Sequence, residues 1–342
     1  VELAVFERGM PRPEEPTLLF VHATGFHART WDRIIESFDG YHVLALDQRG
    51  HGRSEKRIIE HWRVFGEDLA ALVAALGLEN LIGIGHSMGG HALVDAAPKS
   101  GAFARLLLLD PTIAPPESYA NPPPEYAAGG THPGAKRKRL FASPDEMAER
   151  LSGKGAYHLF EPRILRDYCQ HGLEKLASGE FQLLCPPEIE ASVYMTARTN
   201  GGVHDSGRAL DIPVTIMRAQ LPPAERSQMD FASSPTWPEL VGELKQGRDL
   251  HYPECSHFIP MQMPDEVFTA AFGTEWFVRR GAVRAGEPFH TDIFADLSVD
   301  SGPSSRSTPS PGPASSATRS RDASGSEPAP STAWTASRGS SC

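Results

Sequence analysis

Short, wholly apolar runs alternate with helix-like segments along the first 110 residues. Residues 64–76 form the clearest helix, because apolar side chains recur there at 3.6-residue spacing and Gly77 suits the helix end. The apolar runs lack the alternation of half-exposed strands, so we expect both of their faces to be buried. These predicted strands are 3–6, 17–22, 41–47, 81–85 and 105–110. The order predicts an α/β fold with a doubly wound, mostly parallel sheet.

Proline interrupts this alternation after Asp110. The seven prolines between residues 111 and 133 exclude regular helix or sheet there. Three helical candidates follow, with no strand-like run between them, at 143–151, 161–173 and 187–197. We therefore expect a helical lid over 112–208 that separates a first core segment, 1–111, from a second, 209–297.

The alternating pattern resumes in the second core segment. The predicted strands are 212–217 and 249–252, and the predicted helices are 238–244 and 264–279. From about residue 298 the sequence is dominated by Ser, Pro, Gly, Ala and Thr. Such a composition buries too little apolar surface to offset the ordering entropy, which predicts a disordered tail over 298–342.

Gly85-His86-Ser87-Met88-Gly89 stands between a predicted strand and a helical stretch. The spacing G-x-S-x-G is typical of a tight strand-to-helix turn with a strained serine at its tip. Small residues two positions before and after the serine let strand and helix approach closely. The hydroxyl then lies at a helix N-terminus, where developing negative charge is favoured. Ser87 is therefore the candidate nucleophile.

Four segments together resemble the α/β-hydrolase superfamily over roughly residues 1–285: 20–26 (FVHATGF), 46–54 (LDQRGHGRS), 85–90 (GHSMGG) and 256–260 (SHFIP). The resemblance implies a mostly parallel sheet, a lid after the family's sixth strand, and the order nucleophile, acid, histidine. The family has a further N-terminal strand, whereas one strand precedes Thr17 here. Serine at position 87 argues against epoxide hydrolases and haloalkane dehalogenases, which carry aspartate there.

A serine nucleophile needs a base and an acid that orients the base. His257 is the predicted base, because its loop follows the last strand and can fold back over the strand ends. The family order places the acid after strand 212–217, which makes Asp230 the preferred candidate. Glu225 lies in the same loop, and Asp110 at the end of the preceding strand is the third candidate.

An oxyanion hole needs two backbone N–H groups aimed at one point. Met88, after the nucleophile, is expected to supply one and Thr24 the other. Phe26 and His86 are expected to line the substrate site. Arg49 is interpreted as a structural residue that ties loops together. The basic run 136–139 is interpreted as a solvated lid face, with binding of an anionic substrate as the alternative.

Together, the serine nucleophile, the histidine base and the acid predict a serine hydrolase that cleaves an ester, thioester or lactone of a small, fairly apolar molecule, without cofactor or metal. A C–C bond hydrolase or a cofactor-free perhydrolase fits the same three groups. A ligand-binding receptor on the hydrolase fold is the alternative from another class, but a pure binder has no need of the three groups.

Composition narrows the partners further. The net charge of −10 gives no support for a nucleic-acid partner. The sequence contains no run of about 18 apolar residues, so we expect no membrane span. Residues 1–7 lack the pattern of a signal peptide. The four cysteines are scattered, which favours reduced thiols in a cytoplasmic protein.

Overall fold

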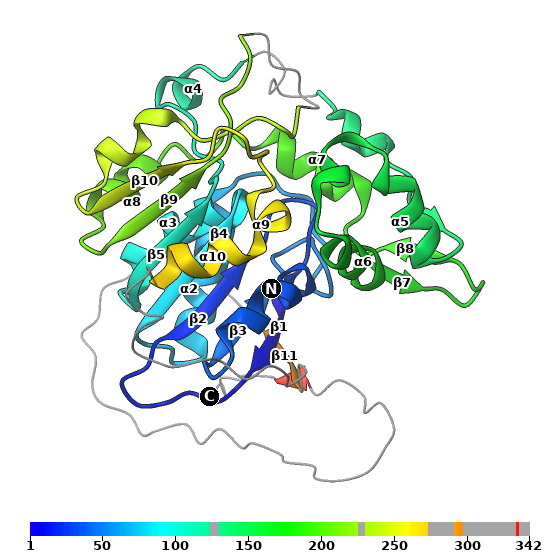
Figure 1. Cartoon of the computed structure of the whole chain (residues 1–342), viewed down its shortest axis with the longest axis horizontal. Helices are drawn as coiled ribbons and strands as arrows, with labels where there is room; N and C mark the ends of the chain where they lie inside the picture. Colours follow the sequence, from blue (N-terminus) through cyan, green and yellow to red (C-terminus); the bar gives the residue numbers. More distant parts are fainter. Residues whose placement is uncertain (124–129, 225–229, 273–290, 297–332, 335–342) are drawn as a thin grey trace, which may run out of the picture.

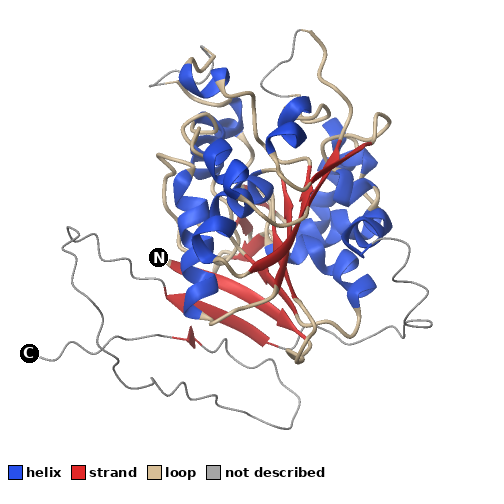
Figure 2. Cartoon of the chain, turned by 90° about the vertical axis from the view of Figure 1, so that its left-hand side faces the viewer, coloured by secondary structure: helices blue, strands red, loops and turns tan. Residues whose placement is uncertain are grey.

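The computed structural model describes residues 1–123, 130–224, 230–272, 291–296 and 333–334. Within these residues, nine strands form one sheet in the order β10-β9-β5-β4-β2-β3-β1-β11-β12. Figure 2 shows this sheet as a twisted layer with helices on both sides. The strands are β1 (Glu2–Arg8), β2 (Thr17–Val21), β3 (Val43–Leu46), β4 (Leu81–His86), β5 (Phe103–Leu109), β9 (Val214–Arg218), β10 (Gly247–His251), β11 (Thr291–Asp296) and β12 (Ala333–Trp334). The predicted doubly wound, mostly parallel sheet is confirmed.

In this sheet the neighbouring strands β10, β9, β5, β4, β2 and β3 are parallel, whereas β1 runs antiparallel to β3. The carboxyl ends of β4, β5, β9 and β10 therefore meet at one edge of the sheet. On its other side β1 pairs with β11, a strand that the sequence did not predict. The chain thus places a C-terminal segment next to β1.

Side chains alternate between the two faces of each central strand. Leu19 and Val21 of β2 face one core cluster, and Leu18 and Phe20 face the other. Because both faces are covered, all five residues of β2 are buried, as the apolar run predicted.

Helices complete the two faces. On one face lie α2 (Arg63–Ala75) and α3 (Met88–Ser100), and on the other α1 (Asp32–Ile35), α9 (Ile259–Gln262) and α10 (Pro264–Phe272). The predicted helix at 64–76 is α2, and its buried residues carry the 3.6-residue spacing. The predicted helix at 238–244 is instead a 3₁₀ helix, Pro238–Glu243.

Between β5 and β9 the chain leaves the sheet, and Figure 1 shows α5, α6 and α7 grouped beyond one end of it. The elements here are α4 (Glu117–Ala120), β6 (Leu140–Phe141), α5 (Pro144–Ser152), α6 (Pro162–His171), β7 (Leu173–Lys175), β8 (Phe181–Leu183), α7 (Pro187–Met195) and α8 (Val203–Ala209). Ser143 caps the N-terminus of α5, because its Oγ accepts the Glu146 N–H at 3.1 Å.

Two features of this region differ from the expectation of a helical lid. The strands β6, β8 and β7 form a small antiparallel sheet. Strands of two or three residues are too short to show a hydrophobic periodicity in the sequence. The helix α8 also packs on the main core, since Val203 belongs to the cluster that contains α3.

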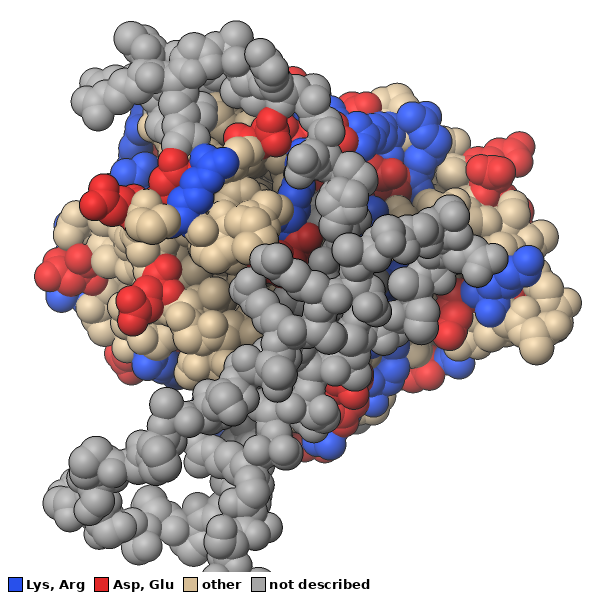
Figure 3. Space-filling view, turned by 90° about the horizontal axis from the view of Figure 1, so that it is seen from below, with Lys and Arg blue, Asp and Glu red and all other residues tan. Residues whose placement is uncertain are grey.

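Much of the C-terminal prediction falls outside the described residues. This holds for residues 273–279 of the predicted last helix and for the predicted disordered tail, except Ala333–Trp334, which pairs with β11. In the part of the chain that the structure describes, no helix is long and apolar enough to cross a membrane. Acidic and basic side chains are interspersed on the face seen in Figure 3.

Candidate active site

Ser87 stands alone between the last residue of β4 and the first residue of α3. Its backbone angles, φ 56° and ψ −115°, are strained for a residue with a Cβ atom. The turn is held in place by the neighbouring strand, because the Ser87 N–H donates to Leu109 O at 3.0 Å. The serine therefore projects at the carboxyl edge of the sheet, as the motif predicted.

The glycines of the motif are needed for close approach. A Cβ atom on Gly89 would lie 2.1 Å from Val21 O, and one on Gly85 would lie 2.6 Å from Gly89 O. Both contacts are far below van der Waals distance and involve rigid backbone atoms. Strand and helix can therefore meet at this angle only if positions 85 and 89 lack side chains.

His257 lies on the loop between β10 and α9, next to the serine. Its Nε2 is 3.0 Å from Ser87 Oγ, and its Nδ1 is 2.7 Å from Asp110 Oδ2. Since a carboxylate only accepts, Nδ1 carries the proton, and Nε2 is free to accept from the serine hydroxyl. The backbone N–H of His257 donates to Ala232 O at 2.8 Å and anchors the loop.

The acid beside the histidine is Asp110, not Asp230. Asp110 follows the last residue of β5 and is fully buried. Its Oδ1 accepts from the Ala219 N–H at 3.1 Å and from the hydroxyls of Ser234 and Thr236 at 2.5 and 3.1 Å. These three donors leave Oδ2 for the imidazole.

Asp230, the predicted acid, stabilises its own loop instead. Its Oδ1 accepts the N–H groups of Ala232 and Ser233 at 3.0 and 3.1 Å. The loop from 219 to 236 thus contributes hydroxyl donors to the acid rather than the acid itself. Glu225 lies outside the described residues.

Thr112 also contacts the nucleophile, which the sequence did not reveal. Its Oγ1 is 3.0 Å from Ser87 Oγ, and its N–H donates to Ser87 O at 3.0 Å. The only available signal was its place two residues after Asp110, because residues near a strand end gather at the carboxyl edge.

The two residues predicted for the oxyanion hole lie side by side. Thr24 Oγ1 donates to Met88 Sδ at 3.5 Å, and Met88 is the first residue of α3. The loop before Thr24 is held by His22, whose Nε2 accepts the Gln48 N–H at 2.9 Å and whose Nδ1 donates to Ala23 O at 2.7 Å. Burial lowers the pKa of His22 to about 3, so it keeps this neutral tautomer.

His86, predicted to contact substrate, contacts the histidine loop instead. Its Nε2 donates to His257 O at 2.8 Å, and its ring packs 4.9 Å from the His257 ring. Burial holds the pKa of His86 well below its ordinary value. His86 therefore supports the histidine loop, and among the described residues it does not line the cavity.

Arg49 has the structural role expected of it. Its Nε donates to Asp68 Oδ2 at 2.8 Å, and its second contact to the same carboxylate is 2.5 Å. This bidentate pair joins the loop after β3 to helix α2.

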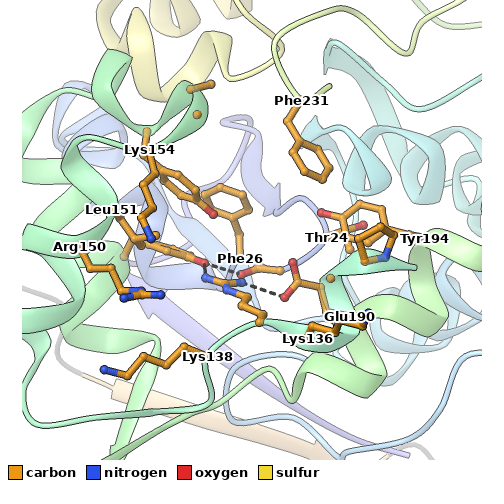
Figure 4. A pocket seen from close by; sticks show the side chains of 18 of the residues that line it. Thr24, Phe26, Lys136, Lys138, Arg150, Leu151, Lys154, Glu190, Tyr194 and Phe231 are labelled. Atoms are coloured by element: carbon orange, nitrogen blue, oxygen red, sulfur yellow. Dashed lines mark hydrogen bonds and ion pairs between the residues drawn. The ribbon is translucent and has the colours of Figure 1, made fainter. Parts of the chain in front are cut away.

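A cavity of about 410 Å³ opens beside Thr24. Phe26 and Phe258 form part of its wall. Figure 4 shows Thr24, Tyr194 and Glu190 on one side of this cavity. Phe258 directly follows His257, so the cavity lies next to the loop that carries this histidine.

Metal binding finds no support in the described residues. No group of three or more His, Cys, Asp or Glu side chains is placed there to hold a metal ion.

Comparison with known proteins gives matches over most of the chain. A sequence model described as the alpha/beta hydrolase family matches residues 18–271. A non-heme haloperoxidase from Rhodococcus erythropolis is 34% identical over 257 residues, or 70% of this chain and 85% of that protein. Lipase LipV from Mycobacterium tuberculosis is 25% identical over 259 residues, or 73% and 89%.

Other matches are shorter or rest on structure. A non-heme chloroperoxidase from Streptomyces lividans is 36% identical over 120 residues, which span 33% of this chain and 42% of that protein. The crystal structure of E-2-(acetamidomethylene)succinate hydrolase superposes with a TM-score of 0.59 at 21% identity, over 78% of this chain and 92% of that chain. At this identity the superposition shows the fold alone.

Proposed function

Because the chain belongs to the alpha/beta hydrolase family of enzymes, we propose that it is a serine hydrolase that cleaves an ester, thioester or lactone of a small molecule. The observation that carries the proposal is the continuous chain of hydrogen bonds from Ser87 Oγ through His257 to Asp110. A serine hydroxyl is a weak nucleophile at neutral pH unless a base accepts its proton. The three groups supply this base and fix its tautomer.

The reaction begins with attack of Ser87 Oγ on the carbonyl carbon while His257 Nε2 takes the hydroxyl proton. The resulting imidazolium is stabilised by the Asp110 carboxylate. As the tetrahedral intermediate collapses, Nε2 returns the proton to the leaving alcohol or thiol. A water molecule then attacks the acyl-enzyme with the same base, which releases the carboxylic acid and restores Ser87.

The negative charge on the carbonyl oxygen needs two donors. The backbone N–H groups of Thr24 and Met88 are assigned this role, because the two residues touch and Met88 directly follows Ser87. Met88 also stands at the N-terminus of the thirteen-residue helix α3, whose dipole favours an anion there.

Perhydrolysis is a second candidate, favoured by the relative named a haloperoxidase. In that reaction hydrogen peroxide replaces water in attacking the acyl-enzyme, and a peracid leaves in place of the acid. The same three residues would act in the same roles. Adding peroxide to an ester assay and measuring peracid distinguishes the two reactions.

We assign the protein to the cytoplasm as part of this proposal. Cys169, Cys185 and Cys255, the described cysteines, are all buried free thiols, a state typical of a reducing compartment.

The direct test is turnover of acyl esters of graded chain length by the wild-type protein and by Ser87→Ala. The proposal expects hydrolysis that saturates with at least one ester and is lost in Ser87→Ala at unchanged melting temperature. Turnover by pure Ser87→Ala above a few per cent of wild type would refute the assignment.

A further inference from the structure

The cavity beside the catalytic groups has two unlike ends. Near Thr24 its wall is aromatic, with Phe26 and Phe258. On the opposite side, Figure 4 shows Arg150 and Lys154 with their charged ends directed toward each other. Both side chains are exposed, and Arg150 lies in the last turn of α5.

The charges deeper in the cavity neutralise one another. Arg137 donates to Glu190 at 2.8 Å and also to the Tyr168 hydroxyl. Among the described residues that line the cavity, Glu190 is the one acidic side chain, and this pair occupies it. Arg137 and Glu190 therefore offer no unpaired charge to a ligand in the interior of the cavity.

The rim is different, because two of its cations, Arg150 and Lys154, lack a carboxylate partner among the described residues. Lys138 pairs with Glu146 and lies 4.8 Å from the centre of the Phe141 ring. In the part of the chain that the structure describes, the side chains of Arg150 and Lys154 make no hydrogen bond or ion pair; the Arg150 charge acts on Glu146 only through its field. Two neighbouring cations that are not neutralised repel each other, and an anion between them would relieve this repulsion.

We propose that Arg150 and Lys154 bind an anionic group on the substrate, at the end remote from the scissile carbonyl. This inference rests on the proposed hydrolase function, because that function places the carbonyl beside Thr24. The substrate is then an ester or thioester with an apolar middle part, which lies along Phe26 and Phe258, and a terminal carboxylate or phosphate. The basic run 136–139, interpreted from the sequence as a solvated lid face, thus lies beside a substrate-binding rim.

Matched substrates test the proposal. Monomethyl adipate and dimethyl adipate share one chain and differ in a terminal charge, so their kcat/KM values isolate the carboxylate. Acetoxybutyl phosphate and butyl acetate form the corresponding pair for phosphate. We expect the charged member of at least one pair to be preferred, and the preference to fall at high salt because the rim is exposed.

The variant for this test is Arg150→Gln combined with Lys154→Gln. Exposed ion pairs are individually weak, so removing both cations should lower the preference for the charged ester by about tenfold. Turnover of the neutral ester should change much less than turnover of the charged ester. Arg166→Gln is the control for loss of a surface cation, because Arg166 is exposed on α6 outside the cavity lining.

Equal kcat/KM for charged and neutral esters, or a preference that survives in the double variant, would overturn the inference. If the wild type hydrolyses no ester, the proposed function fails instead. Calorimetric titration of the intact protein with adipate and with butyl phosphate then decides the inference: binding that the double variant loses supports it, and absence of binding overturns it.

Discussion

The Nδ1 atom of His257 lies 2.7 Å from Oδ2 of Asp110, across 147 positions of sequence. This contact joins the end of β5 to the loop after β10, and it fixes which carboxylate orients the imidazole. Asp110 is also held in an unusual backbone conformation, with φ 48°, which turns its side chain toward the histidine loop.

Asp110→Asn should therefore lower kcat by about 10⁴-fold, because the amide no longer holds the imidazole in the tautomer that accepts the serine proton. Asp230→Asn should leave kcat nearly unchanged, since an amide oxygen still accepts the two backbone N–H groups. Steady-state kinetics and melting temperatures of both variants decide between the two acids. Loss of activity in Asp230→Asn alone would contradict the geometry.

Most of the fold was predictable, but the acid was not. Buried strands leave continuous apolar runs, and a nucleophile turn requires glycine at fixed spacing, so β2, β4 and Ser87 stand out in sequence. The position of an acid depends on which loop reaches His257 in space. Asp110, followed by Pro111, resembled an ordinary strand end, and only tertiary contacts from Ser234 and Thr236 distinguish it.

Features with weak local signals were missed for similar reasons. The small sheet β6-β8-β7 consists of strands too short for periodicity, and β11 has its partner almost 300 residues away in β1. His86 was expected to line the substrate site. At a sharp turn the side chains of adjacent residues diverge, and His86 donates to the backbone of His257 instead.

Ser234→Ala should reduce kcat by roughly tenfold with little change in KM, because a hydrogen bond to a charged group contributes about 1.5–3 kcal/mol. The Ser234 hydroxyl donates to Asp110 at 2.5 Å and so steadies the carboxylate. Ser178→Ala, on the exposed turn between β7 and β8, is the control. Equal kinetics in both variants would show that the hydroxyl contributes nothing to orienting the acid.

His51 should make stability depend on pH. Burial, with a smaller contribution from His22, lowers the pKa of His51 to about 3. Below about pH 6.5 the unfolded chain therefore binds a proton at this histidine that the folded chain does not bind. As the pH is lowered from about 6.5 to about 3, the unfolding free energy decreases by up to about 1.4 kcal/mol per pH unit.

In His51→Gln the slope of unfolding free energy against pH between 5 and 6.5 should be smaller than in wild type. The matched variant is His158→Gln, at an exposed histidine, which should keep the wild-type slope. Denaturant unfolding at several pH values measures both slopes. Identical slopes in wild type and His51→Gln would disprove the prediction.

Gly89→Ala should destabilise the protein by about 3 kcal/mol, the upper part of the range for overpacking, because its Cβ would lie 2.1 Å from Val21 O. Gly101→Ala tests backbone strain alone, since Gly101 has φ 65° and open space around it, and should cost about 1 kcal/mol. The difference between the two unfolding free energies measures the close approach of strand and helix. A smaller loss in Gly89→Ala than in Gly101→Ala would contradict it.

The central claim is that Ser87 is the nucleophile that His257 and Asp110 activate. The most direct measurement is covalent labelling with a fluorophosphonate, followed by mass spectrometry of the labelled peptide. The account predicts one adduct per chain, located on Ser87, with labelling much slower in Asp110→Asn and unchanged in Asp230→Asn. An adduct on another residue, or no adduct on a folded wild-type protein, would contradict the claim.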